Sequence, residues 1–334
     1  MIGTSSRALT RFGRQNRNWL ITAQAGIAAL LLASFGHAQV LVRDTWKDGV
    51  DSDPAAPIHS ENGVDLDGDG DLESAWYQGG DGTLDPVGAN GPLRGRFSAP
   101  TITSSASWTT YFTPGGSEVN LANTGDRLRV TWKYTPTNIN NGGTNTSQNF
   151  RFALVDTPSD AANRLTANGA PASAAFTGYA MFTNMATTLG NSSPFRLMKR
   201  NVASGDLLST SGNWVGVGTT GASTGNDGYD NGAEYTLVWD ITRNAASGLD
   251  FDVSVTGPGI DGDGLAQVLF TDAAPSSFIF DTFAVRPSGA TTTAEIIDTS
   301  LFQVEFSSGG VTPEPASLSI LALAGLGLAR RRRA

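Results

Sequence analysis

Strict alternation of apolar and polar residues is the feature that most restricts the fold of this chain. Residues 127–134 read RLRVTWKY, so that Leu128, Val130, Trp132 and Tyr134 share one face and the polar residues share the other. Successive side chains of a β-strand point to opposite faces, and this pattern therefore predicts a strand with one buried face. Residues 234–243 alternate in the same way, which places Trp239 with Trp132 in the expected core.

Further strands are expected at 149–155, 178–185, 194–199, 251–255, 265–271, 277–285 and 302–306. The segments between them are rich in Gly, Asn, Ser, Thr and Pro, which are the residues that turns require. No helical periodicity separates the strands. About ten strands without intervening helices predict an all-β fold, an antiparallel two-sheet β-sandwich.

Composition excludes several classes of protein. The chain of 334 residues contains no cysteine, so it has no disulfide framework and no thiolate metal site. Its formal net charge is −9, and we therefore expect no nucleic-acid partner, because such proteins need clustered Lys and Arg.

The N-terminal 38 residues predict a secretory signal peptide, residues 1–38, with a helical apolar centre. Four arginines precede the apolar run 19–32, no acidic residue occurs, and Gly36-His37-Ala38 has small residues where cleavage is expected. The alternative is an anchor that stays attached to the domain. In either case the chain is expected to use the secretion translocon.

The C-terminal segment, residues 311–334, contains a second apolar run. Residues 316–329 are apolar and are followed by Arg330, Arg331, Arg332 and Arg333. A helix over this run would be about 21 Å long, shorter than the roughly 30 Å hydrocarbon core, so it predicts a short transmembrane helix that anchors weakly. The arginines are expected to stay in the cytoplasm. The two end segments hold eight of the 22 basic residues but one of the 31 acidic residues, which leaves the body with about −16.

This C-terminal segment resembles the PEP-CTERM sorting signal of Gram-negative bacteria. The matching elements are Pro313-Glu314-Pro315, the apolar run and the arginine cluster. The resemblance implies processing by an exosortase, transient anchoring in the inner membrane, and delivery to the cell surface or to an extracellular matrix such as a biofilm. It also implies a host that makes extracellular polysaccharide.

The body, residues 39–310, resembles exported bacterial proteins with a concanavalin A-like, jelly-roll sandwich. The segments that carry this likeness are residues 44–50, 73–77, 125–128, 150–154 and 280–283. The resemblance concerns the fold, and a fold alone does not determine a function.

An acidic segment is the best candidate metal site. Asp65, Asp67, Asp69, Asp71 and Glu73 alternate with Gly and Leu. Calcium prefers several oxygen ligands, and the first six residues fit the start of an EF-hand loop, whereas position twelve is Trp76 and not the expected Glu. Two interpretations stay open: a calcium loop completed by a distant carboxylate, or a solvated acidic loop.

Carbohydrate binding is the activity that the residue types favour. Sugar rings stack on aromatic side chains, and Trp76, Tyr77 and Trp214 are the candidates for exposed positions. Apart from the signal segment the chain has one histidine, His59, and no Gly-x-Ser-x-Gly motif, so we expect no enzyme activity. The alternatives are a glycan hydrolase or lyase of the same fold and a purely structural matrix component.

Overall fold

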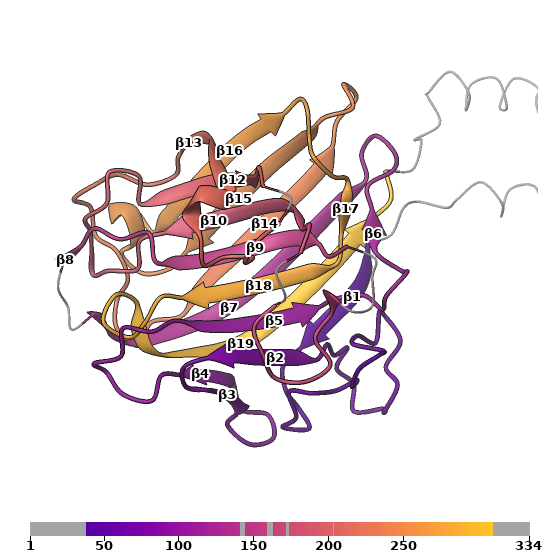
Figure 1. The fold of residues 1–334 in the computed structure, drawn as a ribbon, viewed down its shortest axis with the longest axis horizontal. Coiled ribbons are helices and arrows are strands. Elements are labelled where there is room, and N and C mark those ends of the chain that lie inside the picture. Colours follow the sequence, from indigo (N-terminus) through magenta and orange to yellow (C-terminus); the bar gives the residue numbers. More distant parts are fainter. Residues whose placement is uncertain (1–37, 141–143, 159–162, 172–173, 203, 310–334) are drawn as a thin grey trace, which may run out of the picture. The chain divides into compact units, whose positions relative to one another are not determined.

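A computed structural model describes residues 38–140, 144–158, 163–171, 174–202 and 204–309 (Figure 1). Every strand lies in one compact unit, Ala38–Gly309. Residues 1–37 of the expected signal peptide (1–38) and the expected hydrophobic helix at 311–334 lie outside the described residues.

The larger sheet has eight strands in the order β16-β15-β14-β7-β19-β4-β3, with β1 also paired to β19. All its pairings are antiparallel. Its strands are β1 Gln39–Asp44, β3 Thr83–Pro86, β4 Leu93–Arg96, β7 Arg127–Ile139, β14 Tyr235–Arg243, β15 Leu249–Thr256, β16 Leu265–Asp272 and β19 Ala294–Ser307.

The second sheet has seven strands in the order β13-β12-β10-β9-β18-β5-β2, again antiparallel throughout. Its strands are β2 Trp76–Gly80, β5 Ala106–Tyr111, β9 Phe150–Asp156, β10 Thr177–Thr183, β12 Phe195–Arg200, β13 Trp214–Thr220 and β18 Thr282–Pro287. Two short pairs add β6 Val119–Asn120 with β17 Ile279–Phe280, and β8 Thr144–Asn145 with β11 Thr188–Leu189. Two single 3₁₀ turns, η3 Ser211–Asn213 and η4 Ile260–Gly262, also occur in the described part of the chain.

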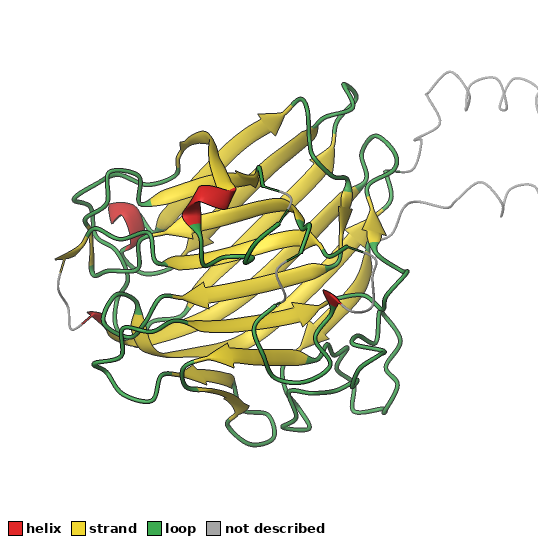
Figure 2. Ribbon diagram, in the orientation of Figure 1, coloured by secondary structure: helices red, strands yellow, loops and turns green. Residues whose placement is uncertain are grey.

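The two sheets stack face to face and confirm the predicted sandwich (Figure 2). Trp132 and Trp239 are fully buried between the sheets, as the alternation in β7 and β14 predicted. Trp132 stacks on Tyr134 with ring centroids 4.3 Å apart, and its indole N–H donates to Thr299 Oγ1 at 3.0 Å. Strand alternation therefore fixes which face of each sheet forms the core.

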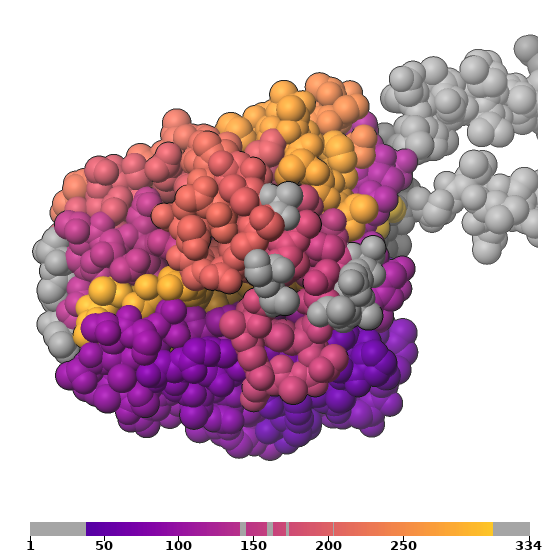
Figure 3. All heavy atoms as spheres, viewed as in Figure 1, coloured from indigo at the N-terminus to yellow at the C-terminus, as the bar shows by residue number. Residues whose placement is uncertain are grey.

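The outer face of the seven-stranded sheet is also partly covered. Ala153 and Val155 alternate with the core residues of β9 and pack in a separate buried cluster with Leu207, Leu208 and Trp214. The connection between β12 and β13 thus lies over the sheet, and its coral atoms form part of the surface seen in Figure 3. We call this connection, residues 201–213, the covering loop. It restricts where ligands can reach the outer face of the sheet.

Candidate functional site

The acidic segment forms a loop that folds around the carboxylate of Asp65. One oxygen of Asp65 accepts the Gly68 N–H at 2.6 Å, and the other accepts the Gly70 N–H at 3.0 Å. Gly68 and Gly70 have φ values of 85° and 89°, which favour glycine. The alternation of Asp and Gly therefore serves the turn itself.

Asp71 anchors this loop to the residues that follow β1. Its Oδ2 accepts hydrogen bonds from the Thr45 N–H at 2.8 Å and the Thr45 hydroxyl at 2.7 Å, while Lys47 Nζ lies 3.1 Å from Oδ1. These contacts, together with a short bridge between Arg43 and Leu72, join the acidic loop to the end of β1. The hydrogen bonds hold the pKa of Asp71 below its usual range despite burial.

Two clusters of carboxylates arise where the acidic loop meets its neighbours. Oxygens of Asp48, Asp53, Asp67 and Glu73 all lie within 4.8 Å of one another, as do oxygens of Glu61, Asp65 and Asp67. The structure therefore brings Asp67 and Glu73 together from the expected set. Asp48, Asp53 and Glu61 were not predicted from the sequence. The first two lie in the run DGVDSD at 48–53, a second acidic segment that could have indicated them.

Glu73 is the unusual member of the first cluster. The residue is 2% exposed, and its Oε1 has no hydrogen-bond partner among the described residues. Burial, and then the negative charges of Asp44 and Asp48, raise the pKa of Glu73 to about 9. Asp69 Oδ2, in the same loop, is also buried without a partner in the described part of the chain.

The aromatic residues expected at the surface are in the interior, which corrects that expectation. Trp76 is 2% exposed and packs edge-on against Phe302 in the core. Trp214 lies under the covering loop, where its indole N–H donates to the Leu207 carbonyl at 2.9 Å. Tyr77 is buried beside His59. These three side chains cannot stack on a sugar ring in this conformation.

His59 is a structural residue and not an exposed acid or base. Its Nδ1 lies 2.9 Å from the Tyr77 hydroxyl. Its ring packs edge-on against the ring of Tyr111, with the two ring centroids 5.0 Å apart. Burial, with a smaller effect of Arg164, lowers the pKa of His59 to about 4. The imidazole is therefore neutral at physiological pH.

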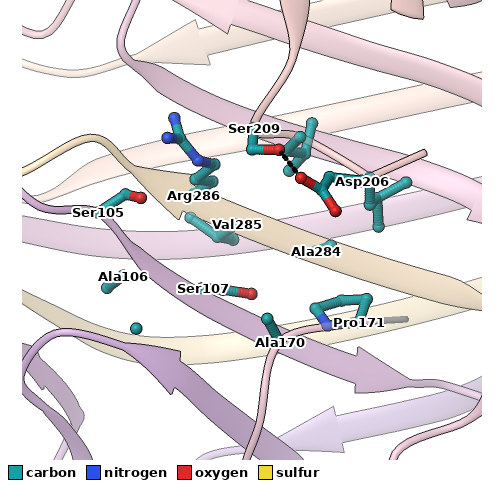
Figure 4. A pocket seen from close by; sticks show the side chains of 13 residues that line it. Ser105, Ala106, Ser107, Ala170, Pro171, Asp206, Ser209, Ala284, Val285 and Arg286 are labelled. Atoms are coloured by element: carbon teal, nitrogen blue, oxygen red, sulfur yellow. Dashed lines mark hydrogen bonds between the residues drawn. The ribbon is translucent and has the colours of Figure 1, made fainter. Parts of the chain in front are cut away.

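A pocket of about 190 Å³ opens on the outer face of β5 and β18, beside the covering loop (Figure 4). Polar groups around it come from Ser105, Ser107, Asp206, Ser209 and Arg286. Ala170, Pro171 and Ala284 supply apolar contacts. Asp206 accepts a hydrogen bond from the Ser209 hydroxyl at 2.7 Å, and Arg286 donates to the Ser288 hydroxyl at 3.2 Å. Neither charged group forms an ion pair within the described residues.

Arg200 fixes the wall of this pocket. Its guanidinium donates to backbone carbonyls of the covering loop at 2.8–3.2 Å, those of Val202, Ser204, Gly205, Asp206 and Leu207. It also lies over the Trp214 ring, 5.1 Å from the centroid. This side chain from β12 thus shapes the part of the loop that places Asp206, and Arg151 donates to the carbonyls of Leu208 and Ser209.

A second, more open hollow of about 390 Å³ lies beside β19 and includes Lys47 and Asp298. Both charges are already paired, Lys47 with Asp71 and Asp298 with Arg94. It therefore offers a ligand fewer free polar groups than the pocket on β5 and β18.

No helix within the described ranges is both long enough and apolar enough to cross a membrane. No curated protein matches the sequence at a significant level. Among solved structures, the chain is similar to the marine PL-14 alginate lyase from Aplysia kurodai, with 10% identity over 66% of this chain and 85% of that one, at a TM-score of 0.39. It is also similar to a Lotus tetragonolobus seed lectin, with 9% identity over 69% and 92% of the two chains, at a TM-score of 0.35.

The sorting signal expected at the C-terminus is confirmed. Residues 311–333 match the model of the PEP-CTERM protein-sorting motif, which includes Pro313, Glu314 and Pro315.

Proposed function

We propose that this protein is exported, sorted by an exosortase, and placed on the cell surface or in the extracellular matrix of a Gram-negative bacterium, where its β-sandwich binds polysaccharide. The sorting motif at 311–333 supports the export and the exosortase partner. The apolar run and the arginine cluster within it suit a transient membrane anchor.

The pocket on β5 and β18 is the observation that supports polysaccharide binding. Sugar hydroxyls take hydrogen bonds from a guanidinium and give them to a carboxylate, and Arg286 and Asp206 offer both in the lining of one small cavity. Ala284 and Pro171 can contact the C–H face of a sugar ring. At about 190 Å³ the pocket is smaller than the roughly 300–1,000 Å³ typical of larger ligands, so it suits one sugar unit of a chain.

We propose that this binding is not catalytic. Glycoside hydrolysis uses two carboxyl groups about 5–10 Å apart across the scissile bond. The pocket is lined by a single carboxylate, Asp206. His59 and Tyr77, which could serve acid–base chemistry, are buried away from solvent.

A glycan array probed with residues 38–309 tests the proposal. Replacing Ser107 by Trp fills the pocket, and Arg286→Ala removes its cation, so both variants should lose a glycan signal that the native domain gives. Lys133→Ala, on the outer face of the other sheet, is the matched control and should bind normally. No signal from the native domain, or equal signals from all four proteins, would reject the pocket. Release of shortened or unsaturated sugars would instead identify an enzyme.

A further inference from the structure

The geometry points to a calcium site between two loops, with Asp48, Asp53, Asp67 and Glu73 as its carboxylate ligands. This site goes beyond the proposed polysaccharide binding and does not depend on it. It also differs from the loop site expected from sequence, because half of its ligands come from outside residues 65–73.

The spacing of the oxygens suits a calcium ion. Two oxygens that both bind one Ca²⁺ at about 2.3–2.6 Å lie at most about 5 Å apart. The four carboxylate oxygens lie within 4.8 Å of one another, so one ion can contact all of them. Calcium takes six to eight oxygen ligands, and backbone carbonyls or water would complete the shell. Carboxylates alone, without histidine or cysteine, favour Ca²⁺ over zinc.

The state of Glu73 distinguishes this cluster from a solvated acidic loop. An exposed carboxylate satisfies its oxygens with water, whereas Oε1 of Glu73 is buried and has no partner among the described residues. Ionising a buried carboxyl group that has no hydrogen bond or counter-charge costs several kcal/mol. Lys47, which contacts this loop, is engaged by Asp71 and Gly70. A bound cation would satisfy Oε1 and offset the repulsion among the four acids.

Two other acids of the loop have other tasks, which leaves them outside the proposed ligand set. Asp65 accepts two backbone N–H groups of its own turn, and Asp71 is bound by Thr45 and Lys47. The ion would therefore tie residues 48–53 to residues 67–73. Both segments precede β2 and contain no regular strand, so the metal would act as a cross-link in the least regular part of the sandwich.

Calorimetric titration of Ca²⁺ into the full chain, purified in detergent and treated with chelator, tests the site. We expect one site per chain, with a dissociation constant near the 10⁻⁴–10⁻³ M typical of extracellular modules, and a higher melting temperature in calcium than in chelator. Glu73→Gln and Asp53→Asn should each weaken binding at least about tenfold. Asp263→Asn, in the other Asp-Gly-Asp-Gly sequence, is the matched control and should bind as the native chain does.

Glu73→Gln changes a buried residue, so loss of binding by this variant alone would not separate a lost ligand from a misfolded domain. Asp53→Asn changes a more exposed ligand and makes that distinction. Circular dichroism should show native strand content for each variant. Binding by both variants with native affinity, or no binding by the native chain, would overturn the proposal. The titration contains no glycan, so its outcome is independent of the polysaccharide test.

Discussion

Arg164 Nη2 lies 2.6 Å from Asp281 Oδ2, and both side chains are shielded from solvent. The same guanidinium donates to the Thr113 carbonyl at 2.7 Å. The segment that carries Arg164 is thereby fixed to the residue before β18 and to the residues that follow β5. Such a pair is costly to break, because the remaining partner keeps its charge in a dry environment.

We expect Arg164→Met to lower the free energy of unfolding by about 3–5 kcal/mol, since Asp281 would lose its counter-charge. Urea unfolding measures this change. Arg94→Met, which breaks the more exposed pair between Arg94 and Asp298, should cost less than about 1 kcal/mol. Equal losses for the two variants would contradict the claim that burial sets the cost.

His59 should make the domain less stable in acid. Burial lowers the pKa of this imidazole to about 4, whereas the unfolded chain titrates near 6.5. Between these values the unfolded state binds more protons, so the stabilisation is complete above pH 6.5 and decreases as the pH falls toward 4. The loss amounts to at most about 3 kcal/mol.

His59→Asn removes the titrating group and introduces asparagine, a residue that tolerates the positive φ of 66° at this position. Unfolding curves from pH 7 to pH 4 should show a steeper loss of stability for the native protein than for the variant. Asp156, whose pKa burial raises to about 7, opposes this trend in both proteins and cancels in the difference. Parallel pH curves would show that His59 does not contribute.

Arg200 should control both stability and ligand binding, because it holds the wall of the pocket. A lysine has three donors and no planar fork, so Arg200→Lys cannot satisfy the five carbonyls that Arg200 engages. We expect a loss of about 2–3 kcal/mol and faster proteolysis between residues 201 and 213. Arg196→Lys, exposed on the same strand, should change stability by less than about 0.5 kcal/mol. Unchanged proteolysis of Arg200→Lys would argue against this role.

Replacement of Pro313-Glu314-Pro315 by three alanines should stop sorting while leaving the sandwich folded, because these residues belong to the matched motif and not to the strands. Cell fractionation should find the variant retained in the membrane and the native protein at the surface or in the matrix. Ser308→Ala, outside the motif, should be sorted normally. Normal sorting of the triple variant would refute the assignment to an exosortase.

Alternation in the sequence predicts most strands, and its failures have local causes. Residues 302–306 are expected to form a strand, but β19 begins earlier, at Ala294. The first half of the strand is missed because the register shifts between Thr299 and Leu301, which changes the phase of the alternation. Ile297 and Thr299 are buried before the shift, and Phe302 and Val304 after it, so no single period describes the strand. Likewise, the expected strand 277–285 divides into β17 and β18 around Asp281.

The candidate sites were harder to predict because they depend on contacts between distant segments. The acidic residues 65–73 stand out in the sequence, but the meeting of Asp67 with Asp48 and Asp53 follows from how two loops pack. Trp214 lies in a glycine-rich region that suggests exposure, yet the loop held by Arg200 covers it. The pocket itself combines β5, β18 and that loop, which no local pattern connects.

The central position of β19 has a consequence for how an exported chain reaches this fold. The last strand of the domain pairs with β7, β4 and β1, and Gln39 of the first strand lies opposite Phe306. During translocation β1 and β7 emerge long before β19, which is their shared partner. The edges of β1 and β7 that pair with β19 therefore stay unpaired until the final residues of the domain arrive. The larger sheet closes only when Ser307 has crossed the membrane, shortly before the sorting motif at residue 311 comes into play. A chain that stalls before β19 would therefore present open sheet edges to chaperones and proteases.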